Sequence, residues 1–278
     1  SYLIESHYEL ISKASGQLPS GFEPSAHYAS RFHPRGLQMA LVGASDALHS
    51  TGLAWQAIVD RVRPDEVGVY SSSALSQVTE EGLGGLMQGR LRGNRTTAKQ
   101  LPLGLNTMPA DFINAYVLGS LGSTGASLGA CASFLYNLRH GIDDIRNGRA
   151  RVVFVGAAEA PITPEIMEGY SAMGALATEK GLRSLDGLKT GEVSDFRRAC
   201  RPFAENCGFT IAESSQMVVL FDDELAMELG ATVFGAAIDV FVNADGHKKS
   251  ISGPGVGNYI TMAKAVAATR AIIGDEGL

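Results

Sequence analysis

Cysteine is scarce in this sequence, which excludes a fold held together by disulfides. Only three cysteines occur, Cys131, Cys200 and Cys207, and their number and spacing do not make a disulfide framework. An odd number of thiols in a chain of 278 residues fits a reducing compartment, so we expect a cytoplasmic protein. Cys200 and Cys207 have no histidine or further cysteine nearby, so we expect neither a metal site nor a second nucleophile there.

Long apolar runs and an excess of positive charge are also missing. No stretch of about 18 unbroken apolar residues occurs, so a membrane span is not expected. No basic segment followed by an apolar one opens the chain, so a signal peptide is not expected either. The net charge of −6 argues against a general affinity for nucleic acid or anionic membranes.

The sequence does have a regular alternation of predicted strands and helices, which indicates the α/β class. A strand–helix–strand unit over residues 125–156 predicts a parallel pair of strands buried on both faces. Helices are predicted at 36–63 (interrupted near Gly52), 106–118, 132–147, 222–229 and 260–273, strands at 67–70, 151–156, 216–221 and 232–242, and a long surface loop at 177–200.

Residues 81–105 are rich in glycine, arginine and lysine. The cations of this segment include Arg90, Arg92, Arg95 and Lys99. A contact with an acidic partner, such as a carrier protein, and an ordinary solvated surface are both consistent with this pattern.

Cys131 stands between an extended segment and the start of a long predicted helix. The free N–H groups and the dipole at a helix N-terminus stabilise a thiolate. The same N–H groups can face the oxygen of an attacked thioester. Gly129 and Ala130 are small and leave room for a substrate. A small cysteine that simply packs before a helix is the alternative, and these residues alone do not decide between the two.

The residues around Cys131 resemble the nucleophile signature of the β-ketoacyl synthases, which are condensing enzymes of the thiolase superfamily. Residues 129–133 read Gly-Ala-Cys-Ala-Ser. Other segments that resemble the family follow in the same order and at similar spacing. These segments are residues 155–159, 163–164, 173–178, 201–203, 208–211 and 244–247, with Pro254 soon after.

The resemblance implies a thiolase-like fold, in which two similar halves stack as layers of helix, sheet, helix, sheet and helix. By that analogy residues 1–229 form most of the N-terminal half, with the nucleophile, and residues 230–278 begin the C-terminal half. Family members are usually dimers paired through the strand before the nucleophile, so we expect a homodimer.

The implied reaction belongs to fatty acid biosynthesis, has two stages and needs no cofactor or metal. An acyl group passes from an acyl carrier protein or acyl-CoA to Cys131 as a thioester. Malonyl carrier protein then loses CO2, and the resulting carbanion attacks that thioester to give a 3-ketoacyl product. A covalent intermediate divides one difficult step into two easier ones. Phe209, in the matching Gly-Phe motif, is expected to be either a hydrophobic gate beside the nucleophile or an ordinary core residue.

The chain also departs from the family pattern. The family completes its site with two histidines, a lysine and a phenylalanine on a second glycine-rich loop, which we expect beyond residue 278, so the fold is expected to be incomplete here. The histidines present do not replace them: His33 is expected at the surface or a cap, and His247, which matches a family turn, is expected to be structural. The family's Gly-Glu-Gly is replaced by Ala212-Glu213-Ser214.

Other functions compete with the condensing enzyme. A thiolase shares the fold, but the Arg-Pro-Phe and Gly-Phe motifs argue against it. A non-catalytic partner of an active synthase, such as a chain-length factor, commonly lacks the nucleophile, so Cys131 argues against that function. A hydrolase or a dehydrogenase fits worse, because we expect no Gly-x-Ser-x-Gly nucleophile elbow and no Gly-x-Gly-x-x-Gly turn after a strand.

Overall fold

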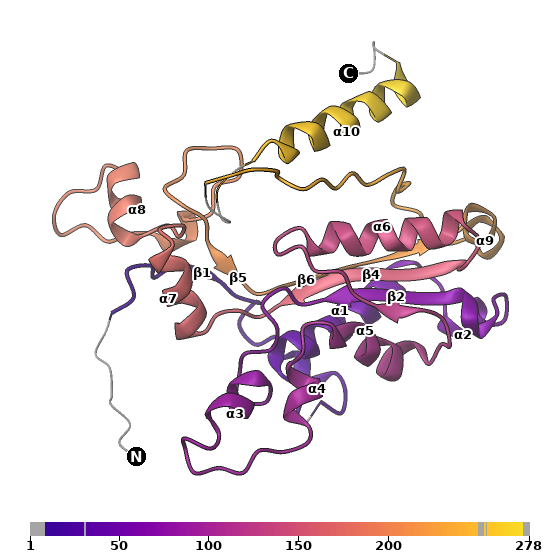
Figure 1. The fold of residues 1–278 in the computed structure, drawn as a ribbon, viewed down its shortest axis with the longest axis horizontal. Helices are drawn as coiled ribbons and strands as arrows, with labels where there is room; N and C mark the ends of the chain where they lie inside the picture. Colours follow the sequence, from indigo (N-terminus) through magenta and orange to yellow (C-terminus); the bar gives the residue numbers. More distant parts are fainter. Residues whose placement is uncertain (1–8, 31, 250–252, 254, 275–278) are drawn as a thin grey trace.

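The computed structural model describes residues 9–30, 32–249, 253 and 255–274. At its centre lies a four-stranded sheet in the order β3-β2-β4-β6 (Figure 1). Strand β2 is parallel to both β3 and β4, and β6 is antiparallel to β4. The strands are β2 (Val67–Ser72), β3 (Thr124–Gly125), β4 (Val152–Glu159) and β6 (Ser214–Phe221).

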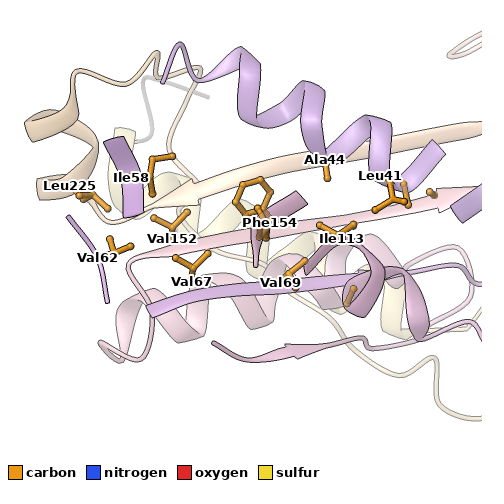
Figure 2. Packing of buried hydrophobic residues seen from close by; sticks show 14 residues of the cluster. Leu41, Ala44, Ile58, Val62, Val67, Val69, Ile113, Val152, Phe154 and Leu225 are labelled. Atoms are coloured by element: carbon orange, nitrogen blue, oxygen red, sulfur yellow. The ribbon is translucent and has the colours of Figure 1, made fainter. Parts of the chain in front are cut away.

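Helices cover both faces of this sheet, which explains why β4 is apolar without alternation. Val152 and Phe154 belong to the large cluster that β4 forms with α1 and α5 (Figure 2). Val153 and Val155 pack on the opposite face, against α6. A strand buried on both faces reads as a continuous apolar run. These helices are α1 (Arg35–Ser50), α5 (Met108–Ile113) and α6 (Ser133–Arg146).

We call residues 24–159 and 214–230 the sheet body. Its predicted helices are confirmed, including the interruption near Gly52, where α1 ends and a short helix follows. Asp222 caps the last helix of the body by accepting a hydrogen bond from Leu225 N, and Gly230 closes it in the left-handed conformation. The other elements of the body are η1 (Pro24–Ala26), α2 (Trp55–Val59), η2 (Pro64–Glu66), α3 (Leu83–Gln88), α4 (Gln100–Gly104), the π-helical turn η3 (Asn114–Leu118) and α9 (Asp223–Leu229).

Residues 9–18 and 160–213 form a second region, which we call the small lobe. Its sheet has only two short parallel strands, and its helices are short (Figure 1). Ser12 Oγ donates a hydrogen bond to the Ala177 carbonyl at 2.9 Å, which ties the first segment to the second. The elements are β1 (Ser15–Gly16), α7 (Pro164–Ala172), α8 (Glu179–Leu185), η4 (Phe196–Arg198) and β5 (Ile211–Ala212).

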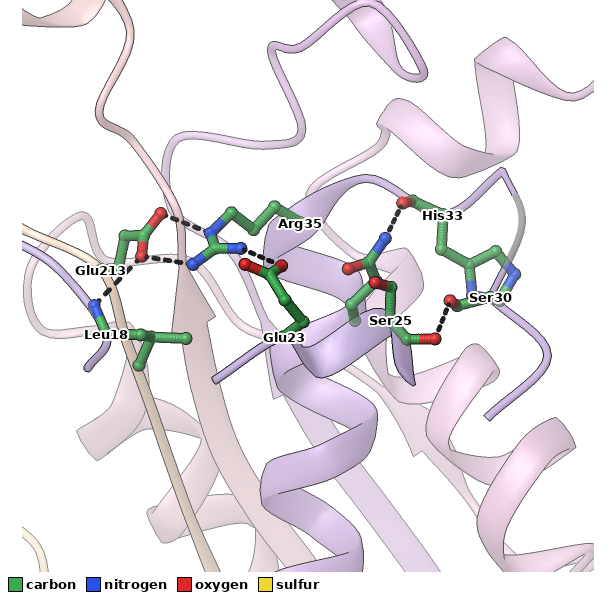
Figure 3. Close-up of polar contacts among 8 residues, drawn as sticks. Leu18, Glu23, Ser25, Ser30, His33, Arg35 and Glu213 are labelled. Carbon is green, nitrogen blue, oxygen red and sulfur yellow. Dashed lines mark hydrogen bonds and ion pairs between the residues drawn. The ribbon is translucent and has the colours of Figure 1, made fainter. Parts of the chain in front are cut away.

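A carboxylate joins the two regions where β5 leads into β6 (Figure 3). Arg35, at the start of α1, donates to both oxygens of Glu213, at 2.6 and 3.1 Å. Leu18 N donates to the same carboxylate at 3.3 Å, and Arg35 also faces Glu23 at 3.5 Å. The glutamate of the diverged Ala212-Glu213-Ser214 motif therefore holds three chain segments together.

Two predicted elements are wrong. Residues 232–242, predicted as a strand, have no regular secondary structure. A strand forms only beside a neighbouring strand that accepts and donates its backbone hydrogen bonds, and apolar side chains alone do not provide such a neighbour. In its place, Arg146 donates a hydrogen bond to the Ile238 carbonyl. Residues 177–200, predicted as a loop, contain α8, which begins where the Thr178 hydroxyl accepts a hydrogen bond from Gly181 N at 3.0 Å.

The strand–helix–strand unit over residues 125–156 exists, but its two strands are not neighbours. Strands β3 and β4 each pair with β2, which lies between them. The crossover through α6 therefore passes over one intervening strand. The direct pairing that the sequence pattern predicted is wrong, because β2 comes from an earlier part of the chain.

The final predicted helix is confirmed as α10 (Gly257–Ile273), which stands apart from the sheet in Figure 1. Pro254 of the matching family turn lies outside the described residues. Among the helices in the described part of the chain, none combines the length and the apolar character that a bilayer crossing requires.

Candidate active site

Cys131 lies two residues before α6 begins, at the edge of the sheet where the parallel strands β2, β3 and β4 end. This edge is where ligands usually bind in open α/β sheets. The Cys131 side chain is exposed rather than packed in the core. Ala130 adopts a left-handed backbone conformation with φ of 49°, which costs a non-glycine residue roughly 1–2 kcal/mol. Strain of this kind persists where the surrounding structure imposes it, as at functional sites.

The turn before Cys131 is fixed by the first residues of α6. Ser133 Oγ accepts a hydrogen bond from Gly129 N at 3.1 Å and donates one to the Ala130 carbonyl at 2.6 Å. The Tyr136 ring packs so closely on Gly129 that a Cβ there would lie 2.4 Å from the ring. Any larger residue at the glycine of the Gly-Ala-Cys-Ala-Ser motif would therefore force this ring to move.

Phe209 lies in the small lobe and meets the aromatic ring of Tyr170 edge-on. The ring centroids are 5.5 Å apart, and the rings are inclined by 81°. Phe209 is 47% exposed and is held by backbone hydrogen bonds to Ala175 and Ala177. Gly208 has a φ of 148°, and a Cβ there would lie 2.5 Å from Ala177 N, so glycine is required before Phe209. The exposure of Phe209 argues against an ordinary core residue.

Tyr170 connects the two regions at this site. Burial raises the pKa of Tyr170 above its ordinary value, and the nearby Cys131 and Glu159 raise it further. Tyr170 is therefore a neutral phenol at neutral pH. Tyr170, which packs against Phe209, is therefore within range of an electrostatic interaction with Cys131 of the sheet body.

Glu159 ends β4 beneath this site. Its carboxylate accepts hydrogen bonds from Ser73 Oγ at 3.0 Å, Ala74 N and Leu75 N. Burial raises the pKa of Glu159, while these three hydrogen bonds act in the opposite direction. The carboxylate thus pins the loop that follows β2 to the end of β4.

Sequence reasoning did not identify Tyr170 or Glu159 as site residues. Glu159 lies within a segment that resembles the family, so that motif was the available signal. Sequence reasoning also overlooked that residues 125–129 read Gly-Ala-Ser-Leu-Gly, the Gly-x-Ser-x-Gly spacing of a hydrolase elbow. Ser127 does not occupy such an elbow, because α6 begins six residues later, at Ser133, rather than immediately after the serine.

The histidines differ from one another in their surroundings. His33 is only 8% exposed, so its expected place at the surface is wrong. It packs edge-on against Phe112 and Tyr116, which a sequence pattern does not reveal. His247 lies in an exposed loop. In the described residues, no three His, Cys, Asp or Glu side chains are grouped so that they could hold a metal ion.

The basic segment is exposed and carries apolar side chains as well. Arg90, Arg92, Arg95 and Lys99 all lie at the surface. Met87 and Leu91, beside them, are 73% and 74% exposed. A surface of this kind combines charge with apolar area, which suits contact with an acidic, partly apolar partner.

Comparison with known proteins matches most of the chain. The sequence pattern of the β-ketoacyl synthase N-terminal domain matches residues 9–226. The chain is 64% identical over 273 residues to the β-ketoacyl-[acyl-carrier-protein] synthase FabY of Pseudomonas aeruginosa, covering 98% of this chain and 43% of that protein. It is 25% identical over 238 residues to 3-oxoacyl-[acyl-carrier-protein] synthase 2 of Staphylococcus aureus, covering 82% of this chain and 53% of that protein. The chain therefore spans about half the length of these curated relatives.

Solved structures give the same result. The crystal structure of the ketosynthase FabY from P. aeruginosa superposes with a TM-score of 0.93 at 64% identity, over 98% of this chain and 42% of that chain. A β-ketoacyl synthase from Burkholderia phymatum superposes with a TM-score of 0.66 at 20% identity, over 81% of this chain and 52% of that chain. The predicted α/β, thiolase-like fold is confirmed.

Proposed function

The chain belongs to the β-ketoacyl synthase family, and from that premise we propose that its protein condenses an acyl thioester with malonyl carrier protein in fatty acid biosynthesis. Cys131 is the residue that accepts the acyl group. The observation that carries this proposal is the exposed thiol of Cys131 at the start of α6, behind the left-handed Ala130. The division of the chain into two halves near residue 230 stays a prediction.

The first stage follows from the position of the thiol. The thiolate of Cys131 attacks the carbonyl carbon of the thioester, and the electron pair moves to the carbonyl oxygen. The positive end of the α6 dipole lies beside this charge and stabilises it. The C–S bond to the donor then breaks, and the donor leaves as a thiol after taking up a proton. The enzyme retains the acyl group on Cys131.

Phe209 and Tyr170 supply the apolar wall for the acyl chain in this proposal. Phe209 is half exposed and stands against Tyr170, which interacts electrostatically with Cys131. Two backbone hydrogen bonds hold the main chain of Phe209, while its half-exposed ring is not enclosed by the core. In this proposal the ring therefore turns to admit an acyl group. We assign Phe209 the role of a hydrophobic gate.

The acyl donor is an acyl carrier protein in this proposal, and acyl-CoA is the simpler alternative. The exposed cations of residues 90–99, with Met87 and Leu91 beside them, support a carrier protein, whose acidic surface they complement. The charge-reversed variant Arg90→Glu with Arg95→Glu is expected to raise KM for acyl carrier protein about tenfold, while KM for acyl-CoA stays within about twofold. Equal effects on both donors would favour an ordinary solvated surface.

We also propose a homodimer that pairs along β3. The two-residue strand β3 is the outermost strand of the sheet. The backbone groups on its outer side therefore face away from β2 and are available to a second copy of the chain. Sedimentation of the full-length protein tests this proposal, and a monomer at micromolar concentration contradicts it. The cytoplasmic location stays a prediction.

Mass spectrometry of the intact full-length protein tests the role of Cys131. After incubation with an acyl-CoA or acyl carrier protein, we expect a mass gain of one acyl group on the wild type. The Cys131→Ala variant is expected to show no gain, and Cys200→Ala, which removes another exposed thiol, is expected to react as the wild type. A folded wild-type protein that gains no acyl group would contradict the proposal and favour a non-catalytic partner of an active synthase.

A further inference from the structure

Asn137 is a fully buried polar side chain that the reaction above does not use. It lies one and a half turns into α6 and has an exposed fraction of 0%. Its Oδ1 accepts a hydrogen bond from Ser127 N at 2.9 Å. Its Nδ2 donates to Ser72 Oγ at 2.9 Å and to the Gly156 carbonyl at 3.0 Å. A buried amide with three hydrogen bonds is well satisfied, and removing it leaves its buried partners without theirs.

The three partners of Asn137 belong to three different parts of the site. Ser127 begins the loop that leads to Cys131, Ser72 is the last residue of β2, and Gly156 lies in β4, three residues before Glu159. One side chain therefore fixes the loop of the nucleophile relative to the two central strands.

The contacts between α6 and this loop all come from one face of the helix. Ser133 binds Gly129 and Ala130, Tyr136 packs on Gly129, and Asn137 binds Ser127. His140 Nε2 lies 2.7 Å from Ser127 Oγ. Positions 133, 136, 137 and 140 have the spacing of neighbours on one helix face. Among them Asn137 also donates hydrogen bonds to both β2 and β4.

We propose that Asn137 is the positioning residue of the nucleophile loop. Its hydrogen bonds hold residues 127–131 over the first turns of α6 and thereby maintain the left-handed Ala130 and the placement of Cys131 at the helix start. Without them the loop relaxes, because the free energy of the chain falls when Ala130 leaves the left-handed conformation. The thiol then loses its alignment with the helix N-terminus. The inference rests on the proposed function only for its effect on acyl transfer, because the placement of the thiol can be measured directly.

The test compares the three thiols of the full-length protein. Wild type, Asn137→Leu and Asn137→Asp are treated with iodoacetamide at neutral pH, and alkylation of Cys131, Cys200 and Cys207 is quantified on peptides by mass spectrometry. In Asn137→Leu we expect alkylation of Cys131 to slow about fivefold and acyl transfer to slow about a hundredfold at unchanged KM, while Cys200 and Cys207 keep their rates. The Asp variant keeps the acceptor for Ser127 N and loses both donors, so its effect on Cys131 is expected to be smaller.

Asn114→Leu is the matched control for a lost hydrogen-bonded amide, here one that is partly buried. The Asn114 side chain makes three hydrogen bonds, all to Ser120, so its loss destabilises the protein without releasing the loop of Cys131. Its Cys131 is expected to react as in the wild type. The inference is overturned if Cys131 keeps its wild-type rates in folded Asn137→Leu and Asn137→Asp, or if all three thiols change together in these variants. A slowed alkylation of Cys131 in a protein that takes no acyl group would support the inference and contradict the proposed function.

Discussion

The sheet body and the small lobe are stabilised by different means. In the sheet body, the large cluster of buried residues is shared by two strands and several helices (Figure 2). In the small lobe, two separate clusters gather around Leu182 and around Met167, and ion pairs such as Arg201–Asp186 and a few side-chain hydrogen bonds to backbone complete the packing.

This difference matches what each region contributes to the site. The sheet body holds Cys131 at the end of packed strands, where a long helix fixes the turn before it. The small lobe presents Tyr170 on the short helix α7 and Phe209 at a single β-bridge to Leu176. Under the proposed function this division is useful, because a nucleophile needs one fixed geometry whereas a wall for acyl chains has to adapt to its substrate.

The largest expected effect comes from the centre of the sheet body. Phe154 is 1% exposed, and its ring lies edge-on to Trp55 at 6.2 Å. Phe154→Ala is expected to lower the free energy of unfolding by about 3–5 kcal/mol, because it leaves a cavity among side chains that cannot collapse. Urea unfolding followed by circular dichroism measures this loss.

The matched variant in the small lobe is Leu182→Ala. Leu182 is 2% exposed but packs mainly among alanines. We expect a loss of about 2–3 kcal/mol that is confined to the small lobe. Hydrogen exchange should then show faster exchange there and unchanged exchange in the sheet body. If Leu182→Ala unfolds the whole protein as readily as Phe154→Ala, the two regions are one cooperative unit and the comparison fails.

The joint between the regions should have an intermediate effect. Arg35→Met removes the ion pair with Glu213, whose side chain is only 9% exposed. We expect a loss of about 1–2 kcal/mol, with faster proteolysis in the small lobe. Arg61→Met is the control, because Arg61 and Glu228 are 54% and 51% exposed and such pairs contribute about 0–1 kcal/mol. Equal losses in the two variants would show that the buried carboxylate does not join the regions.

The smallest expected effect depends on pH and belongs to the sheet body. Burial lowers the pKa of His33, and the groups that face its ring are Tyr28, Phe112 and Tyr116. The unfolded chain binds a proton to His33 below about pH 6.5, whereas the folded protein resists it. The contribution of neutral His33 to the free energy of unfolding is therefore fully present above this pH. It is lost as the pH falls through the lowered pKa of His33 in the folded state.

His33→Leu is expected to flatten this part of the dependence. Melting temperatures of wild type and variant between about pH 8 and about pH 5 provide the measurement. The wild type should lose more stability on acidification than the variant, and the loss should appear in the sheet body. Parallel curves for the two proteins would contradict the role of His33.

Much of the fold could be predicted from local patterns. Periodic apolar residues located α6 and α10, and the run of apolar residues in β4 correctly indicated a strand covered on both faces. The helix predicted over residues 222–229 matches α9, whose ends are capped by Asp222 and Gly230. These signals are reliable because they depend on residues within a few turns of one another.

Other features could not be predicted in this way. The apolar character of residues 232–242 resembles that of a strand, but pairing requires a neighbour from elsewhere in the chain. His33 lies in an irregular segment whose burial depends on Phe112 and Tyr116, far along the sequence. Sequence pattern carries no direct information about such partners.

The sequence by itself determined that Cys131 stands at the start of a helix, between small residues, in a motif shared with the β-ketoacyl synthases. Only the tertiary structure decided that β2 lies between β3 and β4, that Asn137 reaches Ser72 and Gly156, and that Tyr170 packs against Phe209 within electrostatic range of the thiol. The physical reason is the range of the interactions. Capping and periodicity act within a few residues, whereas sheet order and buried hydrogen bonds depend on the packing of the whole chain.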